Sequence, residues 1–182
     1  MTLLVLTDRT VVPAGRHLVE VVRAAVEGGA SHVVLREKDL PRPERAALAA
    51  ELRAFVPVLL VASDSSIEAD GVHLAAVDPF PAPRPAVVGR SCHSHADLER
   101  AAAEGCDYAT LSPIFESTSK PGYGPALGVA ALAGAPLPVY ALGGVDAANA
   151  RRCIDAGAEG VAVMGFVMRA DDPAIAVKEL LA

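Results

Sequence analysis

The densest cluster of side chains able to do chemistry lies in residues 112–124, directly after an apolar, strand-like run. Three adjacent hydroxyls, those of Ser117, Thr118 and Ser119, precede Lys120 in this segment, and two glycines follow. Hydroxyls and glycine amides donate hydrogen bonds to an anion, and an ammonium group adds a compact positive charge. We interpret the segment as an anion-binding loop. The alternative is a flexible polar turn at the surface.

Other polar groups also come directly after apolar runs. They are Arg36-Glu37-Lys38-Asp39, Ser63-Asp64, Asp78, Ser91-Cys92-His93-Ser94, Gly143-Gly144 and Met164-Gly165. Glycines permit the backbone to approach a phosphate closely, while the cations at positions 36, 38 and 120 suit a second, more highly charged anion. The carboxylates at positions 64 and 78 are hard oxygen ligands, suited to Mg²⁺ that is shared with substrate phosphates.

Each of these groups also has a plainer interpretation. An arginine at a strand end is often part of a surface ion pair, for which Glu37 or Asp39 would serve Arg36. The glycines would then only form tight turns, and an aspartate would only balance Arg36. His73 falls within a strand pattern, so we interpret it as a wall residue without an acid–base role. The roles of Cys92 and His93 stay open.

The residues between these groups predict strands and helices in alternation. The strands are continuous apolar runs, typical of parallel strands buried on both faces. They are expected at Leu3–Thr7, His32–Arg36, Pro57–Ala62, Gly71–Leu74, Ala86–Ser91, Asp107–Leu111, Pro138–Leu142 and Gly160–Met164. Helices are expected at Arg16–Glu27, Arg42–Phe55, Ala96–Glu104, Gly128–Ala133, Ala147–Ala156 and Pro173–Leu181, with Asp146 and Asp172 as caps of the last two.

This alternation, with a weak repeat before the even-numbered strands, indicates an α/β fold: a single (β/α)₈ TIM barrel over residues 1–182. Residues 65–69 are too few for a crossover helix, and residues 78–85 are too rich in proline. We therefore expect reduced helices after strands 3 and 4, and a thin wall there. Either a partner subunit would cover this wall in a homo-oligomer, or the sector would be mobile. The carboxyl ends of barrel strands line the active site, so the polar groups are expected on one rim.

Composition excludes several classes of partner. A net charge of −6 argues against nucleic acid and anionic membranes as the main partners. No apolar run approaches the roughly 18 residues of a membrane span, and no basic region of a signal peptide precedes the first strand. Cys92, Cys106 and Cys153 lack metal-like spacing, which indicates a reducing cytoplasm.

Several segments together carry a family resemblance: Leu4–Asp8, Leu35–Leu40, Asp70–Leu74, Gly89–Ser94, Asp107–Gly124, Tyr140–Val145 and Gly157–Met164. Through them, nearly the whole chain resembles the thiamine-phosphate synthase and thiazole tautomerase family, and residues 112–124 are closer to the synthase. The resemblance implies a (β/α)₈ barrel and a transferase reaction. In that reaction a pyrimidinylmethyl diphosphate loses pyrophosphate, and the thiazole nitrogen of hydroxyethylthiazole phosphate attacks the resulting cation.

The resemblance also implies residue roles. Arg36, Lys38 and Lys120 would act in catalysis by holding the diphosphate, together with Ser91. Asp64 and Asp78 match the Mg²⁺ ligands of the family. The remaining substrate-binding positions would be Val34, Leu35, Glu37 and Ser63 near the pyrimidine diphosphate, and Ser117, Thr118, Ser119, Gly144, Met164 and Gly165 around the thiazole phosphate.

The chain also departs from the family pattern. Val34 stands where the synthase usually carries a Gln that helps to hold the pyrimidine, Ser63 stands in place of an Asn, and Gly165 in place of a frequent Ser. Pro113 stands where the tautomerase branch has a His, and the segment between Asp64 and Asp78 is several residues short. Two alternatives follow: a thiazole tautomerase, or a catalytically weakened barrel that binds a thiamine precursor.

Overall fold

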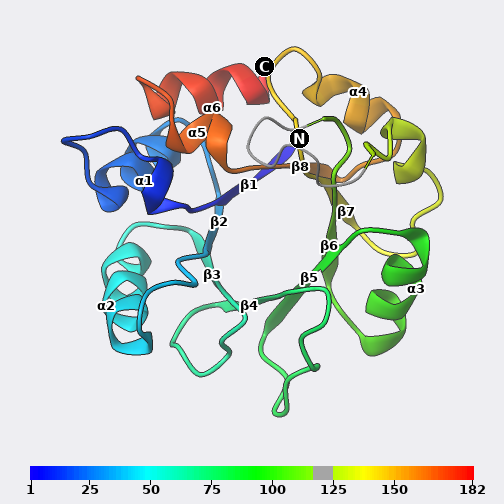
Figure 1. Ribbon diagram of the computed structural model, residues 1–182, viewed down its shortest axis with the longest axis horizontal. Helices are drawn as coiled ribbons and strands as arrows, with labels where there is room; N and C mark the ends of the chain where they lie inside the picture. The colour runs from blue at the N-terminus through cyan, green and yellow to red at the C-terminus, as the bar shows by residue number, and fades with distance from the viewer. Residues whose placement is uncertain (117–124) are drawn as a thin grey trace.

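A computed structural model describes residues 1–116 and 125–182. Its eight parallel strands close into a barrel, in which each strand pairs with the next and β8 pairs with β1 (Figure 1). The strands are β1 (Thr2–Leu6), β2 (His32–Leu35), β3 (Val58–Ala62), β4 (Gly71–Leu74), β5 (Val87–Cys92), β6 (Tyr108–Leu111), β7 (Val139–Ala141) and β8 (Gly160–Val163). The predicted (β/α)₈ barrel is confirmed.

Strand side chains alternate between the barrel interior and the layer beneath the helices. On β1, Leu4 belongs to the interior cluster, whereas Leu3 and Val5 belong to the outer core. The interior cluster consists of Leu4, Leu6, Val34, Leu60, Ala62, Tyr108 and Ala162. Because both faces are buried, the strands read as continuous apolar runs.

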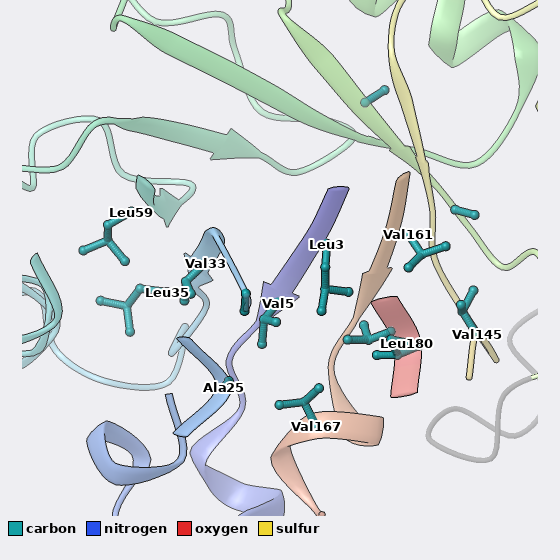
Figure 2. Close-up of a cluster of buried hydrophobic side chains, with 14 of the residues drawn as sticks. Leu3, Val5, Ala25, Val33, Leu35, Leu59, Val145, Val161, Val167 and Leu180 are labelled. Atoms are coloured by element: carbon teal, nitrogen blue, oxygen red, sulfur yellow. The ribbon is translucent and has the colours of Figure 1, made fainter. Parts of the chain in front are cut away.

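The outer core joins the first strand to the last helices. Figure 2 shows Leu3 and Val5 of β1 facing Val167 and Leu180, which come from the two helices that follow β8. Val167 is fully buried and Leu180 is almost so. This packing closes the outer layer where the two ends of the chain meet.

The helices around the barrel are α1 (Leu18–Glu27), α2 (Arg42–Arg53), α3 (His95–Glu104), α4 (Ala150–Asp155), α5 (Gly165–Met168) and α6 (Pro173–Leu181), with 3₁₀ turns η1 (Arg9–Val11) and η2 (Val129–Leu132). The predicted bounds of α6 and its cap are confirmed, since the Asp172 side chain accepts a hydrogen bond from the Ile175 backbone nitrogen at 3.0 Å. Among the helices in residues 1–116 and 125–182, none is both long and apolar enough to cross a membrane.

Two helix predictions are wrong in detail, and one helix was not predicted. The segment Gly128–Ala133 forms only the 3₁₀ turn η2, which Gly128 enters with a φ of 74°. The helix expected from Ala147 begins only at Ala150, because the Asp146 carboxylate binds the backbone N–H groups of Ala148 and Asn149 and holds a turn there. The unpredicted helix is α5, which is four residues long.

The expected thin wall is present. No helix lies between β3 and β4 or between β4 and β5, and the structure describes both connections throughout (Figure 1). Val77, in the second connection, is 89% exposed. A homo-oligomer that covers this face stays a prediction.

Candidate functional site

The polar groups expected at strand ends share one rim of the barrel. All eight strands run parallel, so residues that follow their carboxyl ends gather at the same end of the barrel. The structure therefore brings together the segments after β2, β3, β4, β5, β7 and β8. Ser117, Thr118, Ser119 and Lys120 lie outside the described residues, so their predicted roles stay predictions.

The segment after β2 is held from below by a buried carboxylate. Glu37 is 2% exposed, and its Oε1 accepts a hydrogen bond from the Thr7 hydroxyl at 2.7 Å. The backbone nitrogen of Arg9 donates to both Glu37 oxygens, at 3.1 and 3.2 Å. The same Thr7 oxygen accepts from the backbone nitrogen of Arg36 at 2.9 Å. Glu37, predicted to bind substrate, is thus engaged with β1 and its following turn, between Arg36 and Lys38 in the sequence.

The structure does not support the interpretation of Arg36 as half of a surface ion pair with Glu37 or Asp39. Glu37 and Asp39 both pair with Arg9, at 3.4 and 2.7 Å, rather than with Arg36. The hydrogen bond from Arg9 lowers the pKa of the Asp39 carboxyl, although partial desolvation opposes this shift. Arg36 is half-buried on the rim, with its charge not neutralised by either neighbour.

The two apolar positions at the end of β2 face opposite ways. Val34 is fully buried in the interior cluster, so its side chain lines the inside of the barrel below the rim. Leu35 is fully buried in the outer core, so its side chain points away from the interior. Of these two predicted substrate contacts, only Val34 presents a side chain toward the interior.

A buried polar chain crosses the interior from β4 to β6. His73 is 3% exposed; its Nδ1 lies 2.8 Å from the Tyr108 hydroxyl and its Nε2 lies 3.0 Å from the Ser91 hydroxyl. Burial, with the positive charges of Lys38 and Arg36, lowers the pKa of His73 to about 3. His73 is therefore neutral at physiological pH, and it orients Ser91, one of the predicted diphosphate contacts.

Asp78 lies at the rim as a partly buried, ionised carboxylate. Its Oδ2 accepts a hydrogen bond from the backbone nitrogen of Ala75 at 2.7 Å. Burial raises the pKa of Asp78, but a hydrogen bond from Ser63, the Ala75 N–H and the charge of Lys38 outweigh it, so the pKa lies below its usual value. Ser63 adopts a left-handed backbone with a φ of 58°, a conformation that Asn tolerates better than Ser.

Asp64 is committed to two arginines. Its Oδ2 accepts a hydrogen bond from Arg45 Nη2 at 3.0 Å and lies 3.8 Å from Arg42 Nε, while its Oδ1 accepts from the Ser66 backbone nitrogen at 3.1 Å. Burial raises the pKa of Asp64, but the hydrogen bonds from Ser66 and the charges of Arg45 and Arg42 lower it overall. An aspartate could instead balance the charge of Arg36. In the contacts between described residues, however, neither Asp64 nor Asp78 pairs with Arg36.

The residues fit Mg²⁺ in kind, because ionised carboxylates are hard oxygen ligands. Within residues 1–116 and 125–182, no cluster of three or more His, Cys, Asp or Glu side chains is arranged to hold a metal ion. Asp64 and Asp78 alone supply fewer ligands than the roughly six that Mg²⁺ takes, so the fit requires substrate phosphate oxygens and water.

Arg90, a residue absent from the predicted site, fixes the loop that carries Asp78. Its side chain is 1% exposed, and its Nη1 donates to the backbone oxygens of Ala75 and Asp78 at 3.0 and 2.9 Å. Its Nη2 lies 2.7 Å from Glu104 of α3. Arg90 therefore anchors the helix-free connection after β4 to the next helix.

Gly143 and Gly144 support the base of the loop after β6. The backbone nitrogen of Ile114 donates to the Leu142 oxygen at 2.9 Å, and that of Phe115 donates to the Gly143 oxygen at 2.9 Å. Gly144 has a φ of 65°, and a Cβ there would lie 2.7 Å from the Phe115 Cβ. Glycine at 144 thus lets the described start of the β6 loop lie directly on the end of β7.

Met164 and Gly165 follow β8 as expected. Met164 is half-buried and packs against both the interior cluster and the outer core. Gly165 begins α5, and the guanidinium of Arg169 occupies the space beside it. Arg169 was not among the predicted site residues.

Cys92 and His93 have structural contacts. Burial, with the charge of Asp97, raises the pKa of the Cys92 thiol to about 12, so it is not a nucleophile at neutral pH. His93 Nδ1 lies 2.9 Å from the backbone oxygen of Ser112, and its backbone nitrogen donates to Asp97 at 3.0 Å. His93 thereby ties the end of β5 to the start of the β6 loop.

A closed barrel of eight parallel strands whose polar residues gather at one rim defines a (β/α)₈-barrel enzyme. The chain belongs to the thiamine monophosphate synthase family, whose model matches residues 3–167. Thiamine-phosphate synthase of Methanoculleus marisnigri is 39% identical, over 98% of this chain and 92% of the relative. A putative thiamine-phosphate synthase of Geobacter sulfurreducens is 36% identical, over 100% of this chain and 93% of the relative.

Solved structures share the fold of this chain. Thiamine phosphate pyrophosphorylase from Pyrococcus furiosus superposes with a TM-score of 0.84 at 30% identity, covering 99% of this chain and 93% of that one. A 3-hexulose-6-phosphate synthase superposes with a TM-score of 0.73 at 20% identity, covering 99% of this chain and 98% of that one, and shows the fold alone.

Proposed function

We propose that this protein is a thiamine-phosphate synthase. It joins a pyrimidinylmethyl diphosphate to hydroxyethylthiazole phosphate and releases pyrophosphate. The observation that carries the proposal is the Arg36–Lys38 segment, which the buried Glu37 holds on the same rim as Ser91, Asp78 and Gly144. Two anionic substrates need two positively polarised sites on one rim.

The mechanism begins with departure of the diphosphate. Charge develops on the leaving group as its bond to the pyrimidinylmethyl carbon breaks, so fixed positive charge lowers the barrier. Arg36 and Lys38 supply that charge, and Ser91, oriented by His73, donates a hydrogen bond. Lys120, which follows β6 in the sequence, would add a third cation.

The second step is attack of the thiazole nitrogen on the pyrimidinylmethyl cation. It requires a positioned thiazole and exclusion of water from the cation. Gly144, Met164 and Gly165 hold the thiazole phosphate, together with Ser117, Thr118 and Ser119. The apolar interior beneath the rim, which includes Val34, keeps water from the reacting carbon.

Asp64 and Asp78 would hold Mg²⁺ together with the diphosphate. The ion, when bound, supplies positive charge at the leaving oxygens. To bind the ion, Asp78 would have to release no partner side chain other than Ser63. Asp64 would have to share its oxygens between the ion and Arg45. The substrates are thus small phosphorylated molecules, and the three buried, unpaired cysteines favour a cytoplasmic location.

A two-substrate assay with Mg²⁺ tests the proposal. A synthase forms thiamine phosphate only when both substrates are present, whereas a thiazole tautomerase isomerises its thiazole without pyrimidine or metal. Isomerisation of the thiazole without formation of thiamine phosphate would show that the protein is a thiazole tautomerase. Tight thiazole phosphate binding with neither reaction would replace it by a binding protein.

A further inference from the structure

We infer that Arg169 is a phosphate-binding residue of this protein and that Gly165 is the partner position that makes room for it. The inference rests on the proposed function, because the phosphate is that of the thiazole substrate. It adds a cation that the sequence pattern of strand ends does not reveal.

The first observation is the contact between Arg169 and Gly165. A Cβ at Gly165 would lie 2.8 Å from Arg169 Cζ and 3.0 Å from Arg169 Nη2, and closer still to Nη1. Such distances are shorter than real Cβ contacts, so the guanidinium occupies the volume that any side chain at 165 needs. A side chain at 165 would therefore push the guanidinium, which is the mobile end of Arg169, out of this place.

The second observation is how the backbone of α5 aims this side chain. The backbone nitrogen of Arg169 donates to the Gly165 oxygen at 3.1 Å, which places the two residues one helical turn apart. Side chains in a helix lean toward its N-terminus. The guanidinium is thereby directed back toward the end of β8, beside the residues that complete the thiazole phosphate site.

The third observation is that α5 is a fixed platform. Val167 and Met168 are both fully buried, and Figure 2 shows Val167 directed into the outer core with Leu3 and Leu180. Arg16 Nη1 also donates to the Ala170 backbone oxygen at 3.0 Å, just beyond the helix. Arg169 itself is exposed, so its guanidinium can meet a substrate from solvent while its backbone stays in place.

The chemistry of the guanidinium suits a phosphate monoester. Its planar fork can donate two parallel hydrogen bonds to phosphate oxygens, which an ammonium group cannot do. The backbone approach permitted by Gly144 supplies an N–H group beside it. Arg169 would therefore select for the phosphorylated thiazole over its free alcohol.

The test measures calorimetric binding of hydroxyethylthiazole phosphate and of unphosphorylated hydroxyethylthiazole to Arg169→Ala, Arg169→Lys and a matched control. The control is Arg151→Ala, which removes an exposed arginine of α4 that pairs with Asp155 on the same helix. Arg169→Ala is expected to raise the Kd of the phosphate ester about tenfold, the loss of a charge-assisted hydrogen bond. The Kd of the phosphate ester for Arg169→Lys should lie between those for Arg169→Ala and the wild type. The Kd of the alcohol should not change in any variant, and Arg151→Ala should bind both compounds as the wild type does.

Gly165→Ala tests the pairing. The added Cβ must displace the guanidinium, so this single variant should lose affinity for the phosphate ester. In the Arg169→Ala chain the same substitution should cause no further loss of affinity. Independent losses that multiply in the double variant would overturn the pairing.

The outcomes separate this inference from the proposed function. A synthase whose affinity for the phosphate ester is unchanged in Arg169→Ala would overturn the inference alone. Arg169-dependent ester binding by a chain that forms no thiamine phosphate would support the inference and overturn the synthase. Equal weakening of ester and alcohol would overturn the inference, since it would show a structural role.

Discussion

His73 Nε2 lies 3.0 Å from the Ser91 hydroxyl, and this contact joins β4 to β5 inside the barrel. The opposite ring nitrogen lies 2.8 Å from the Tyr108 hydroxyl. Both ring nitrogens are thus engaged, and burial, with the charges of Lys38 and Arg36, holds the pKa of His73 at about 3. The imidazole is therefore neutral, and it holds the Ser91 and Tyr108 hydroxyls in place under the rim without acting as an acid or base.

His73 makes stability depend on pH. Its pKa is about 3 in the folded chain against 6.5 for an ordinary His, so the unfolded chain binds more protons between these values. Stability is therefore lost as pH falls from 6.5, by about 1.4 kcal/mol per pH unit for this one proton. His73→Gln should lack this loss in urea unfolding followed as a function of pH. Parallel pH dependences of the two proteins would contradict the assignment.

Replacing Glu37 should reduce stability and substrate affinity more than replacing its exposed counterpart Asp39, although both carboxylates pair with Arg9. Glu37→Ala leaves the Thr7 hydroxyl and the Arg9 N–H without a buried acceptor, at a cost of about 1–3 kcal/mol each. It should also raise the KM for the pyrimidine diphosphate, because Arg36 and Lys38 lose their support.

The matched control for Glu37 is Asp39→Ala, which removes only an exposed pair and should leave both properties near wild type. Urea unfolding and steady-state kinetics check the two variants. Equal effects of the two substitutions would contradict the positioning role of Glu37.

Gly144→Ala should weaken use of the thiazole phosphate. The new Cβ would lie 2.7 Å from the Phe115 Cβ and displace the described base of the β6 loop. Gly134→Ala is the control, because Gly134 has a similar φ of 69° but a Cβ added there would meet no atom within 4 Å. Both should lose about 1 kcal/mol of stability from the left-handed backbone, and Gly144→Ala should lose more because its Cβ also collides with the Glu116 backbone oxygen. Only Gly144→Ala should raise the KM for thiazole phosphate; a similar rise in both would remove the special role of Gly144.

Lys120→Ala should lower turnover by about tenfold or more, because it removes one charge-assisted contact to the leaving diphosphate. Lys178→Ala, which removes an exposed lysine in the last turn of α6, is the matched control and should leave turnover unchanged. Single-turnover kinetics with saturating substrates separate this effect from binding. Unchanged kinetics in Lys120→Ala would favour the alternative interpretation of residues 112–124 as a polar turn at the surface.

Asp78→Asn should raise the Mg²⁺ concentration that gives half-maximal rate. The carboxylate is ionised at neutral pH, and Asn keeps an oxygen but loses the charge that binds the ion. Asp155→Asn, on the exposed face of α4, should leave the Mg²⁺ dependence unaltered. An Mg²⁺ dependence that is the same in Asp78→Asn and the wild type would exclude Asp78 as a ligand.

The barrel and its rim were predictable, because both follow from local patterns. Buried parallel strands are continuous apolar runs, and the first polar residue after each, such as Arg36 or Asp78, falls at the carboxyl end. The shortened helices were harder to predict. Local competition at Gly128 and Asp146 overrides helix propensity, since a positive φ and a side-chain-held turn delay helix entry.

The support beneath the rim was not predictable, because it depends on contacts between strands. Adjacency in sequence suggests that Glu37 pairs with Arg36, yet the barrel places Thr7 and Arg9 beside it. The contact of His73 with Tyr108 depends likewise on Gly89, because a Cβ there would collide with the Tyr108 ring. Only the folded barrel brings these residues from separate strands together.

The most direct test of the synthase assignment is a time course of pyrophosphate and thiamine phosphate in one reaction with both substrates and Mg²⁺. We expect the two products to appear in equal amounts and at equal rates, with no thiamine phosphate when either substrate is omitted. Absence of thiamine phosphate in the complete reaction, or pyrophosphate release without it, would contradict the assignment of the chain as a synthase.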